Sequence, residues 1–130
     1  KKHEASGIKA FDFIQKMDEA YAVADIVISR AGASSISELC VVEKPCILVP
    51  SPNVAEDHQT KNAMALVNKQ AAVLVKDMDA RNKLCAEALQ LINDDAKCNT
   101  LSENIGALAF KDSAITIAKE VLRLIELRSK

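Results

Sequence analysis

The part of the sequence best suited to bind an anion is a serine-rich segment that contains a glycine. It spans residues 29–38, follows a short β-branched run and leads into a helical pattern. Gly32 lets a ligand approach the backbone closely, and a helix that begins here presents unpaired N–H groups and the positive end of its dipole. Ser34 and Ser35 add hydroxyl donors at the same end. The segment therefore predicts a site for a diphosphate that needs no metal ion.

Glu38 extends this segment by about one helical turn, because it lies four residues after Ser34. A carboxylate accepts hydrogen bonds from two vicinal hydroxyl groups, which a ribose carries close to its phosphate. Residues 35–38, Ser-Ile-Ser-Glu, also fit the capping-box pattern, in which the glutamate merely caps its own helix. The spacing alone leaves both interpretations open.

A second polar segment, residues 50–62, follows the next apolar run and also enters a helical pattern. His58, Gln59 and Asn62 offer the donors and acceptors that a sugar ring requires. The alternative is that the Asp-His-Gln sequence at this helix start only caps the helix in contact with solvent. Because Asp57 and His58 are neighbours that do not face each other on a helix, we assign His58 no catalytic proton transfer.

Short strands that alternate with helices must position these two segments. Apolar runs predict parallel strands at residues 25–29, 46–50 and 71–75, with a remnant of an earlier strand at 7–10. Helical periodicity predicts helices at 17–23, 35–43, 57–69, 81–92, 96–108 and 113–128. This order is typical of an α/β fold with a Rossmann-like parallel sheet and flanking helices. Both polar segments then lie at the carboxyl ends of strands, where such sheets bind ligands.

The composition limits the classes of function. The 130 residues are 49% hydrophobic and predict one domain, residues 1–130, with a helical C-terminal tail at 79–130. A net charge of -1, 3% aromatic residues and no tryptophan argue against nucleic-acid binding. We find no apolar run long enough for a membrane helix. The apolar stripe Val121, Leu122, Leu124 and Ile125 predicts core packing.

The four cysteines show neither a C-x-x-C pair nor a nearby histidine at the spacing of metal ligands. This pattern predicts no metal site and no redox motif. We interpret Cys40, Cys46, Cys85 and Cys98 as reduced and mostly buried thiols.

Residues 29–38 and 56–63 together, at this separation, resemble the C-terminal domain of the MurG family of bacterial N-acetylglucosaminyltransferases. The match continues in order through Phe13-Ile14 and residues 20–25 and 44–50, so the resemblance covers residues 8–127. It implies the C-terminal domain of a GT-B glycosyltransferase, incomplete on its N-terminal side. In that fold, two Rossmann-like domains close over a cleft.

The resemblance also implies the site residues. The backbone of Ile14 corresponds to a uracil contact, and Glu38 corresponds to the glutamate that binds the ribose. The implied diphosphate contacts are Ala33, Ser34 and Ser35, and the implied N-acetylglucosamine contacts are His58 and Gln59. His58 departs from the glutamine-rich pair of the family. Arg30 is interpreted as structural or close to the diphosphate, and no catalytic residue, metal or cofactor is assigned to this chain.

The implied activity is that of a hexosyltransferase. Such an enzyme transfers N-acetylglucosamine from UDP-N-acetylglucosamine to lipid I with inversion, which forms lipid II. This step belongs to peptidoglycan and cell-wall biogenesis, which support cell shape and cell division, and it occurs on the cytoplasmic face of the bacterial inner membrane. The general base and the acceptor site belong to an N-terminal domain outside this sequence. We therefore expect the chain alone to be inactive, and to self-associate through an exposed sheet surface.

Two alternatives remain. One is a stand-alone donor-binding subunit of a two-subunit N-acetylglucosaminyltransferase. The other is a non-enzymatic domain that binds nucleotides or other proteins, against which the intact set of Gly32, Ser35, Glu38 and Gln59 argues.

Overall fold

A parallel sheet of three strands forms the centre of the protein, in the order β1-β2-β3. The structure, a computed structural model, describes residues 6–53, 57–109 and 113–128. The strands are β1 (Val27–Ser29), β2 (Cys46–Leu48) and β3 (Val73–Leu74). In the register of the sheet, Ile28 pairs with Ile47, and Ile47 pairs with Val73. The predicted α/β architecture is therefore confirmed, with strands shorter than the sequence pattern indicated.

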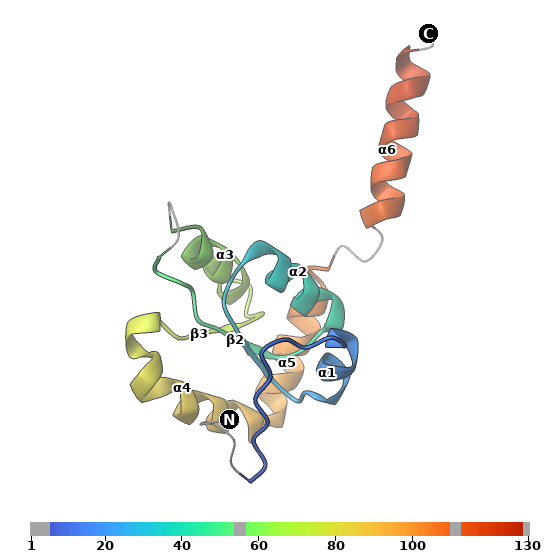
Figure 1. Cartoon of the computed structure of the whole chain (residues 1–130). Helices are drawn as coiled ribbons and strands as arrows, with labels where there is room; N and C mark the ends of the chain where they lie inside the picture. The colour runs from blue at the N-terminus through green and yellow to red at the C-terminus, as the bar shows by residue number, and fades with distance from the viewer. Residues whose placement is uncertain (1–5, 54–56, 110–112, 129–130) are drawn as a thin grey trace.

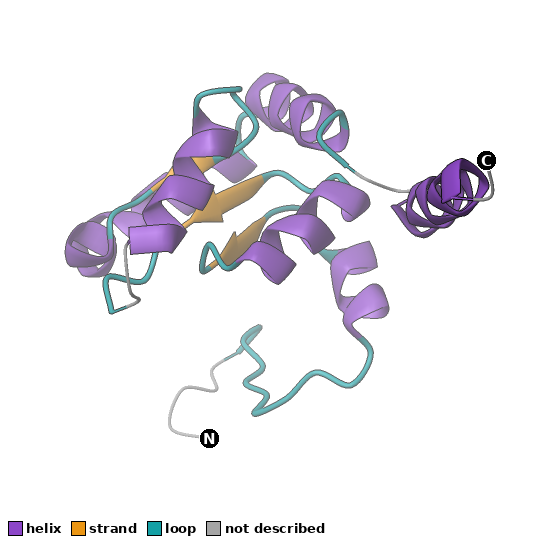
Figure 2. Ribbon diagram, turned by 90° about the horizontal axis from the view of Figure 1, so that it is seen from above, coloured by secondary structure: helices purple, strands orange, loops and turns teal. Residues whose placement is uncertain are grey.

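Helices cover both faces of the sheet, as Figure 2 shows. One face buries Cys46 and Leu48 against α2 (Ala33–Val42) and α3 (His58–Val67), together with Tyr21 of α1 (Met17–Val23). The other face buries Ile47 and Val49 against α4 (Asp77–Ile92) and the first half of α5 (Asp95–Gly106). Alternate residues of β2 thus supply both layers of the core, because successive side chains of a strand point to opposite faces.

Helix α5 closes the amino ends of the strands. Ser102 Oγ donates to the carbonyl oxygen of Glu43, and Asn104 Nδ2 donates to that of Gln70 at 2.9 Å. Glu43 precedes β2 and Gln70 precedes β3 along the chain. The carboxyl ends of the strands therefore lie at the opposite end of the sheet from these contacts.

The structure corrects three expected boundaries. Residue 7 lies in a turn and residues 8–10 have no regular secondary structure, and all four residues are exposed, so no packing stabilises a further strand there. Helix α2 begins at Ala33, two residues earlier than predicted. Helix α4 begins at Asp77 instead of residue 81, and the acidic residues Asp77 and Asp79 in its first turn favour this start through the helix dipole.

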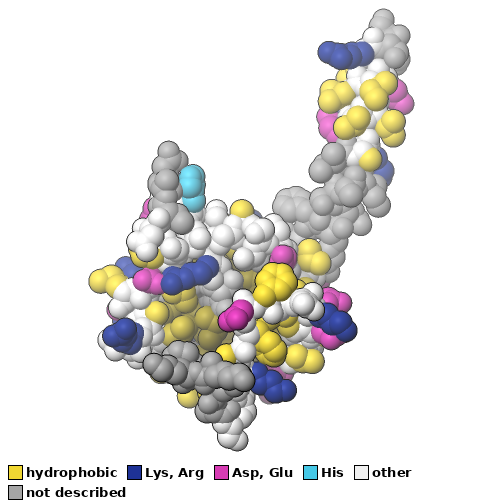
Figure 3. Space-filling view, in the orientation of Figure 1, with side chains coloured by type: hydrophobic (Ala, Val, Ile, Leu, Met, Phe, Trp, Pro, Cys, Tyr) yellow, Lys and Arg dark blue, Asp and Glu magenta, His cyan; other side chains and the backbone are white. Residues whose placement is uncertain are grey.

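The apolar stripe near the C-terminus does not pack into this core. Helix α6 (Ser113–Arg128) lies away from the other elements in Figure 1, and its apolar side chains are visible on the surface in Figure 3. The exposed fractions of Val121, Leu122, Leu124 and Ile125 are between 50% and 60%. The prediction of core packing is therefore wrong for these residues, because α2, α3, α4 and α5 already cover both faces of the sheet. Among the described helices, none combines the length and hydropathy needed to cross a bilayer.

The cysteines are free thiols in different environments. Cys40 and Cys46 are buried, Cys98 is half-buried and Cys85 is exposed. Burial raises the pKa of the Cys46 thiol to about 12, with a smaller contribution from Cys40. The expectation of buried thiols thus holds for two of the four residues.

We predict that Ile47→Ala lowers the free energy of unfolding by about 2–5 kcal/mol, because it leaves a cavity beneath the central strand where Ile47 is fully buried. Ile28→Ala is the matched control, since Ile28 is the register partner of Ile47 but is 46% exposed. Its cost should be about 1 kcal/mol or less, in proportion to its smaller buried area. Equal losses in urea denaturation would contradict the described packing.

Candidate functional site

The three strands end at one rim of the sheet, and the polar segments predicted from the sequence lie there. Arg30 follows β1 and connects the strand ends. Its Nη1 donates to the carbonyl oxygen of Val49 at 3.3 Å and to Asp77 Oδ1 at 2.5 Å. The Arg30 and Asp77 side chains are 55% and 37% exposed, so this ion pair contributes at most about 1 kcal/mol. Of the two interpretations given for Arg30, these contacts favour the structural one.

Helix α2 begins at this rim with a glycine at its N-cap. Gly32 has extended backbone angles (φ -67°, ψ 150°), and its carbonyl oxygen accepts the first helical hydrogen bond, from the Ile36 N–H at 3.0 Å. The N–H groups of Ala33, Ser34 and Ser35 fall in the first turn, where a helix offers them no acceptor of its own. Apart from its two chain neighbours, no atom of the described residues lies within 4 Å of the position that a Cβ atom at Gly32 would take. The start of α2 is thus an open turn with amide donors.

Glu38 does not cap its helix. Because α2 begins at Ala33, Ser35 is the third helical residue and cannot serve as the N-cap that a capping box requires. The Glu38 carboxylate instead accepts a hydrogen bond from the Tyr21 hydroxyl, with 3.0 Å between Oη and Oε2. The capping interpretation is therefore wrong, and Glu38 faces α1.

A wide groove of about 1000 Å³ opens beside this pair. Tyr21, Ile36 and Glu38 form part of its lining, and Leu66 and Leu108 contribute to its apolar surface. Ile14 is 41% exposed in the segment before α1 and is not among the lining residues. The predicted uracil contact at Ile14 stays a prediction.

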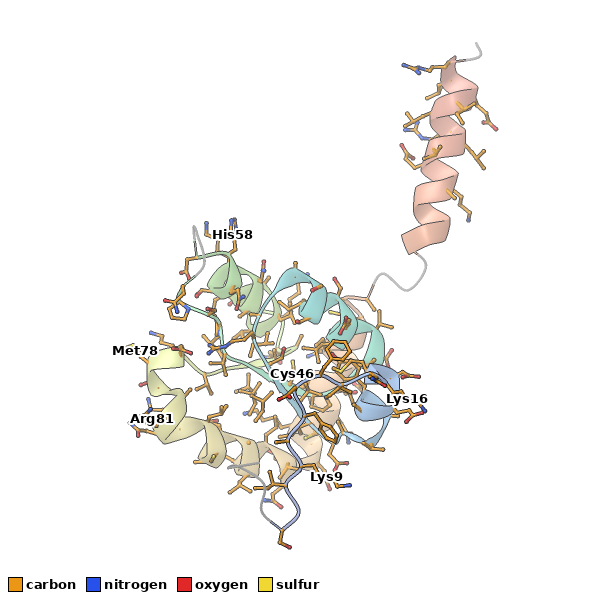
Figure 4. All side chains as sticks on the ribbon, in the orientation of Figure 1. Lys9, Lys16, Cys46, His58, Met78 and Arg81 are labelled. Carbon is orange, nitrogen blue, oxygen red and sulfur yellow. The ribbon has the colours of Figure 1, made fainter. Side chains whose placement is uncertain are left out.

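The two residues expected to contact the sugar, His58 and Gln59, are consecutive on α3 but differ in their exposure and contacts. His58 is exposed at the first turn of α3 (Figure 4). Gln59 is half-buried, and its Oε1 accepts from the N–H of Ser51 at 2.8 Å and from the N–H of Ala31 at 3.2 Å. Asn62 Nδ2 donates to the carbonyl oxygen of Ala31 at 3.1 Å. Gln59 and Asn62 thus contact the turn that precedes α2.

Tyr21, the partner of Glu38, has a raised pKa. Burial is the main cause, and the hydrogen bond and the negative charge of Glu38 add to it, so that the pKa of Tyr21 rises from 10.0 to about 12. Tyr21 therefore stays protonated at neutral pH and acts as a hydrogen-bond donor, not as a base. In the described ranges, no group of three or more His, Cys, Asp or Glu side chains is placed to hold a metal ion.

The sequence analysis did not identify Tyr21 as the partner of Glu38 or Asp77 as the partner of Arg30. Tyr21 reaches Glu38 across 17 residues, and Asp77 reaches Arg30 across 47 residues. Local spacing contains no signal for pairs so far apart. Asn62 was considered only as a sugar contact, but it bonds to the backbone of Ala31.

Comparisons with known proteins relate the chain to one family. The model of the glycosyltransferase family 28 C-terminal domain matches residues 1–117. The chain is 65% identical over 115 residues to a Bacteroides fragilis protein named UDP-N-acetylglucosamine--N-acetylmuramyl-(pentapeptide) pyrophosphoryl-undecaprenol N-acetylglucosamine transferase, covering 88% of the chain and 30% of that protein. A Bacteroides thetaiotaomicron protein of the same name is 59% identical over 123 residues, covering 95% of the chain and 33% of that protein.

A solved structure shows the same fold. The crystal structure of Acinetobacter baumannii MurG matches with a TM-score of 0.70 and 26% identity, over 78% of this chain and 29% of that one. The chain therefore spans about a third of the length of the relatives that it matches.

The hydrogen bond between Tyr21 and Glu38 can be tested by titration, because the chain has one tyrosine and no tryptophan. We predict that tyrosinate absorption appears near pH 12, and that Glu38→Gln shifts it part of the way toward 10.0, since burial remains. The folded pKa lies above the ordinary value, so this group's contribution to stability is complete below about pH 10 and is lost as the pH rises to about 12. An unchanged pKa in Glu38→Gln would show that the pair does not form.

Proposed function

The chain belongs to the glycosyltransferase family 28 C-terminal domain, and on that basis we propose that it binds the sugar-nucleotide donor of an N-acetylglucosaminyltransferase. The donor is UDP-N-acetylglucosamine, which the names of the relatives contain. The observation that carries the proposal is the open glycine turn at the start of α2, with the Glu38 carboxylate one helical turn away. The assignment of residues 1–130 to this one domain is part of the same proposal.

The diphosphate binds at the start of α2 in this proposal. Ala33, Ser34 and Ser35 offer backbone N–H groups, and the exposed Ser34 adds a hydroxyl. The positive end of the helix dipole favours an anion at this position. The open space at Gly32 allows the phosphate oxygens to reach the backbone.

The ribose binds at Glu38. Tyr21 holds Oε2 of this carboxylate, so Oε1 is left to accept from the vicinal ribose hydroxyl groups. The groove beside Glu38 is lined largely by apolar side chains and gives the nucleoside a surface to pack against. We propose the uracil contact at the backbone of Ile14, which precedes α1, the helix that carries Tyr21, by three residues.

The N-acetylglucosamine binds at the start of α3. His58 is exposed there, and the Gln59 side chain has its Nε2 amide left to donate to a sugar hydroxyl group. Both residues follow the loop after β2, on the same rim as the glycine turn. The donor thus extends along the carboxyl ends of the strands, from α1 to α3.

The complete reaction requires groups beyond these. The amide donors of α2 stabilise the UDP leaving group as negative charge develops on it. We propose that the acceptor, the N-acetylmuramyl-(pentapeptide) pyrophosphoryl-undecaprenol in the names of the relatives, binds to parts of those proteins that this chain does not match. The proposal places the enzyme on the cytoplasmic face of the bacterial inner membrane. It also includes self-association of this chain through the outer edge of β1, which pairs only with β2 among the described strands.

The donor site can be tested by titrating the chain with UDP and with UDP-N-acetylglucosamine while following amide NMR shifts. We predict saturable binding that perturbs residues 32–38. Glu38→Ala should weaken both ligands by more than about tenfold, roughly 1.4 kcal/mol, because it removes the acceptor for the ribose hydroxyl groups.

The matched control is Glu103→Ala. This substitution removes an exposed glutamate from α5, which caps the opposite end of the sheet, and should leave both affinities unchanged. No saturable shift with either ligand, or an equal effect of both substitutions, would contradict the proposed donor site.

A further inference from the structure

Gln59 and Asn62 both contact the backbone of one residue in the turn before α2, Ala31. Ala31 is fully buried, and it lies beyond Ser29, the last residue of β1 in the sheet register. Its N–H group donates to Gln59 Oε1 at 3.2 Å, and its carbonyl oxygen accepts from Asn62 Nδ2 at 3.1 Å. The two polar backbone atoms of Ala31 are thus satisfied by side chains of α3.

The same Gln59 oxygen also accepts from the N–H group of Ser51 at 2.8 Å. Ser51 follows β2, whereas Ala31 follows β1. One side-chain oxygen therefore joins the ends of two neighbouring strands. Gln59 and Asn62 are three residues apart on α3, so they lie on the same face of the helix and reach the turn together.

We propose that Gln59 and Asn62 are positioning residues that hold the glycine turn in the orientation needed to bind the donor diphosphate. This inference rests on the proposed function. Ala31 directly precedes Gly32, the N-cap of α2, so holding the peptide units on both sides of the Ala31 Cα restricts the direction in which the first N–H groups of α2 point. Hydrogen-bond strength depends steeply on direction, so a turn that is free to rotate presents a poorer anion site.

The two roles of Gln59 use different atoms. Oε1 receives the two backbone N–H groups, and Nε2 is left for the sugar. A residue that acts only as a sugar contact affects UDP-N-acetylglucosamine binding but not UDP binding, because UDP carries no sugar ring beyond its ribose. A positioning residue affects both ligands.

The experiment compares Gln59→Met and Asn62→Leu, which keep side-chain size and helix propensity but remove the hydrogen bonds to Ala31. Thr60→Val is the matched control on the same helix turn, since the Thr60 hydroxyl makes no hydrogen bond to any described residue. Each variant is titrated with UDP and with UDP-N-acetylglucosamine. Hydrogen exchange of the Ala31 and Ser51 amides is measured without ligand.

We expect Gln59→Met and Asn62→Leu to weaken UDP binding by about fivefold or more, within the range for losing one hydrogen bond at a site. Gln59→Met should accelerate exchange at both amides, Gln59→Glu should preserve their protection because it keeps an acceptor oxygen, and Thr60→Val should change nothing. If Gln59→Met fails to fold, Asn62→Leu and Gln59→Glu still carry the test.

UDP affinities within about twofold of the wild type in both Gln59→Met and Asn62→Leu would overturn the positioning role, even if UDP-N-acetylglucosamine binds more weakly, because that result marks a sugar contact alone. A wild-type chain that binds neither ligand would instead overturn the proposed function, and the positioning role with it. The two failures are therefore distinguishable.

Discussion

The buried backbone of Ala31 is the constraint on which the arrangement of the site depends. Ala31 follows the paired part of β1 and is fully buried, so neither a neighbouring strand nor water satisfies its polar atoms. A buried N–H or C=O group without a partner costs about 1–3 kcal/mol. Gln59 and Asn62 remove this cost, and they do so only while the first two turns of α3 lie against the end of β1. The location of α3 and the direction of α2 are thereby tied together.

The two ends of the sheet are stabilised in different ways, and this difference explains why the site lies where it does. At the amino ends, Ser102 and Asn104 of α5 bond to backbone carbonyl oxygens, and Ile105 is fully buried in the core beside them. At the carboxyl ends, the contacts of Arg30 and Gln59 connect one strand end to the next but leave the N–H groups at the start of α2 uncovered. The start of α2 therefore offers backbone donors to a ligand at the carboxyl end of the described sheet.

The architecture was predictable from the sequence because apolar residues recur with the period of a strand or a helix where one face is buried. The elements β2, α2 and α3 each contribute such buried residues to the core. It also predicted that residues 29–38 and 50–62 lie at one rim, since parallel strands bring their carboxyl ends together. The long-range partners were not predictable, because Tyr21 and Glu38 are 17 residues apart and Ala31 and Gln59 are 28 apart. The stripe on α6 was misassigned for a related reason: periodicity identifies an apolar face but not what covers it.

Because the chain is nearly neutral, the geometry of the glycine turn matters more for diphosphate binding than the electrostatic field of the whole protein. With a net charge of -1, the protein offers a diphosphate no large long-range attraction, and the binding energy must come from groups in direct contact. A helix N-terminus contributes about 0.3–1 kcal/mol to an exposed anion, and up to about 2 kcal/mol in favourable geometry. Such small contributions give a useful affinity for a diphosphate only when several N–H groups point at it together. The hydrogen bonds that orient the turn from α3 therefore matter to anion binding although neither Gln59 nor Asn62 carries a charge.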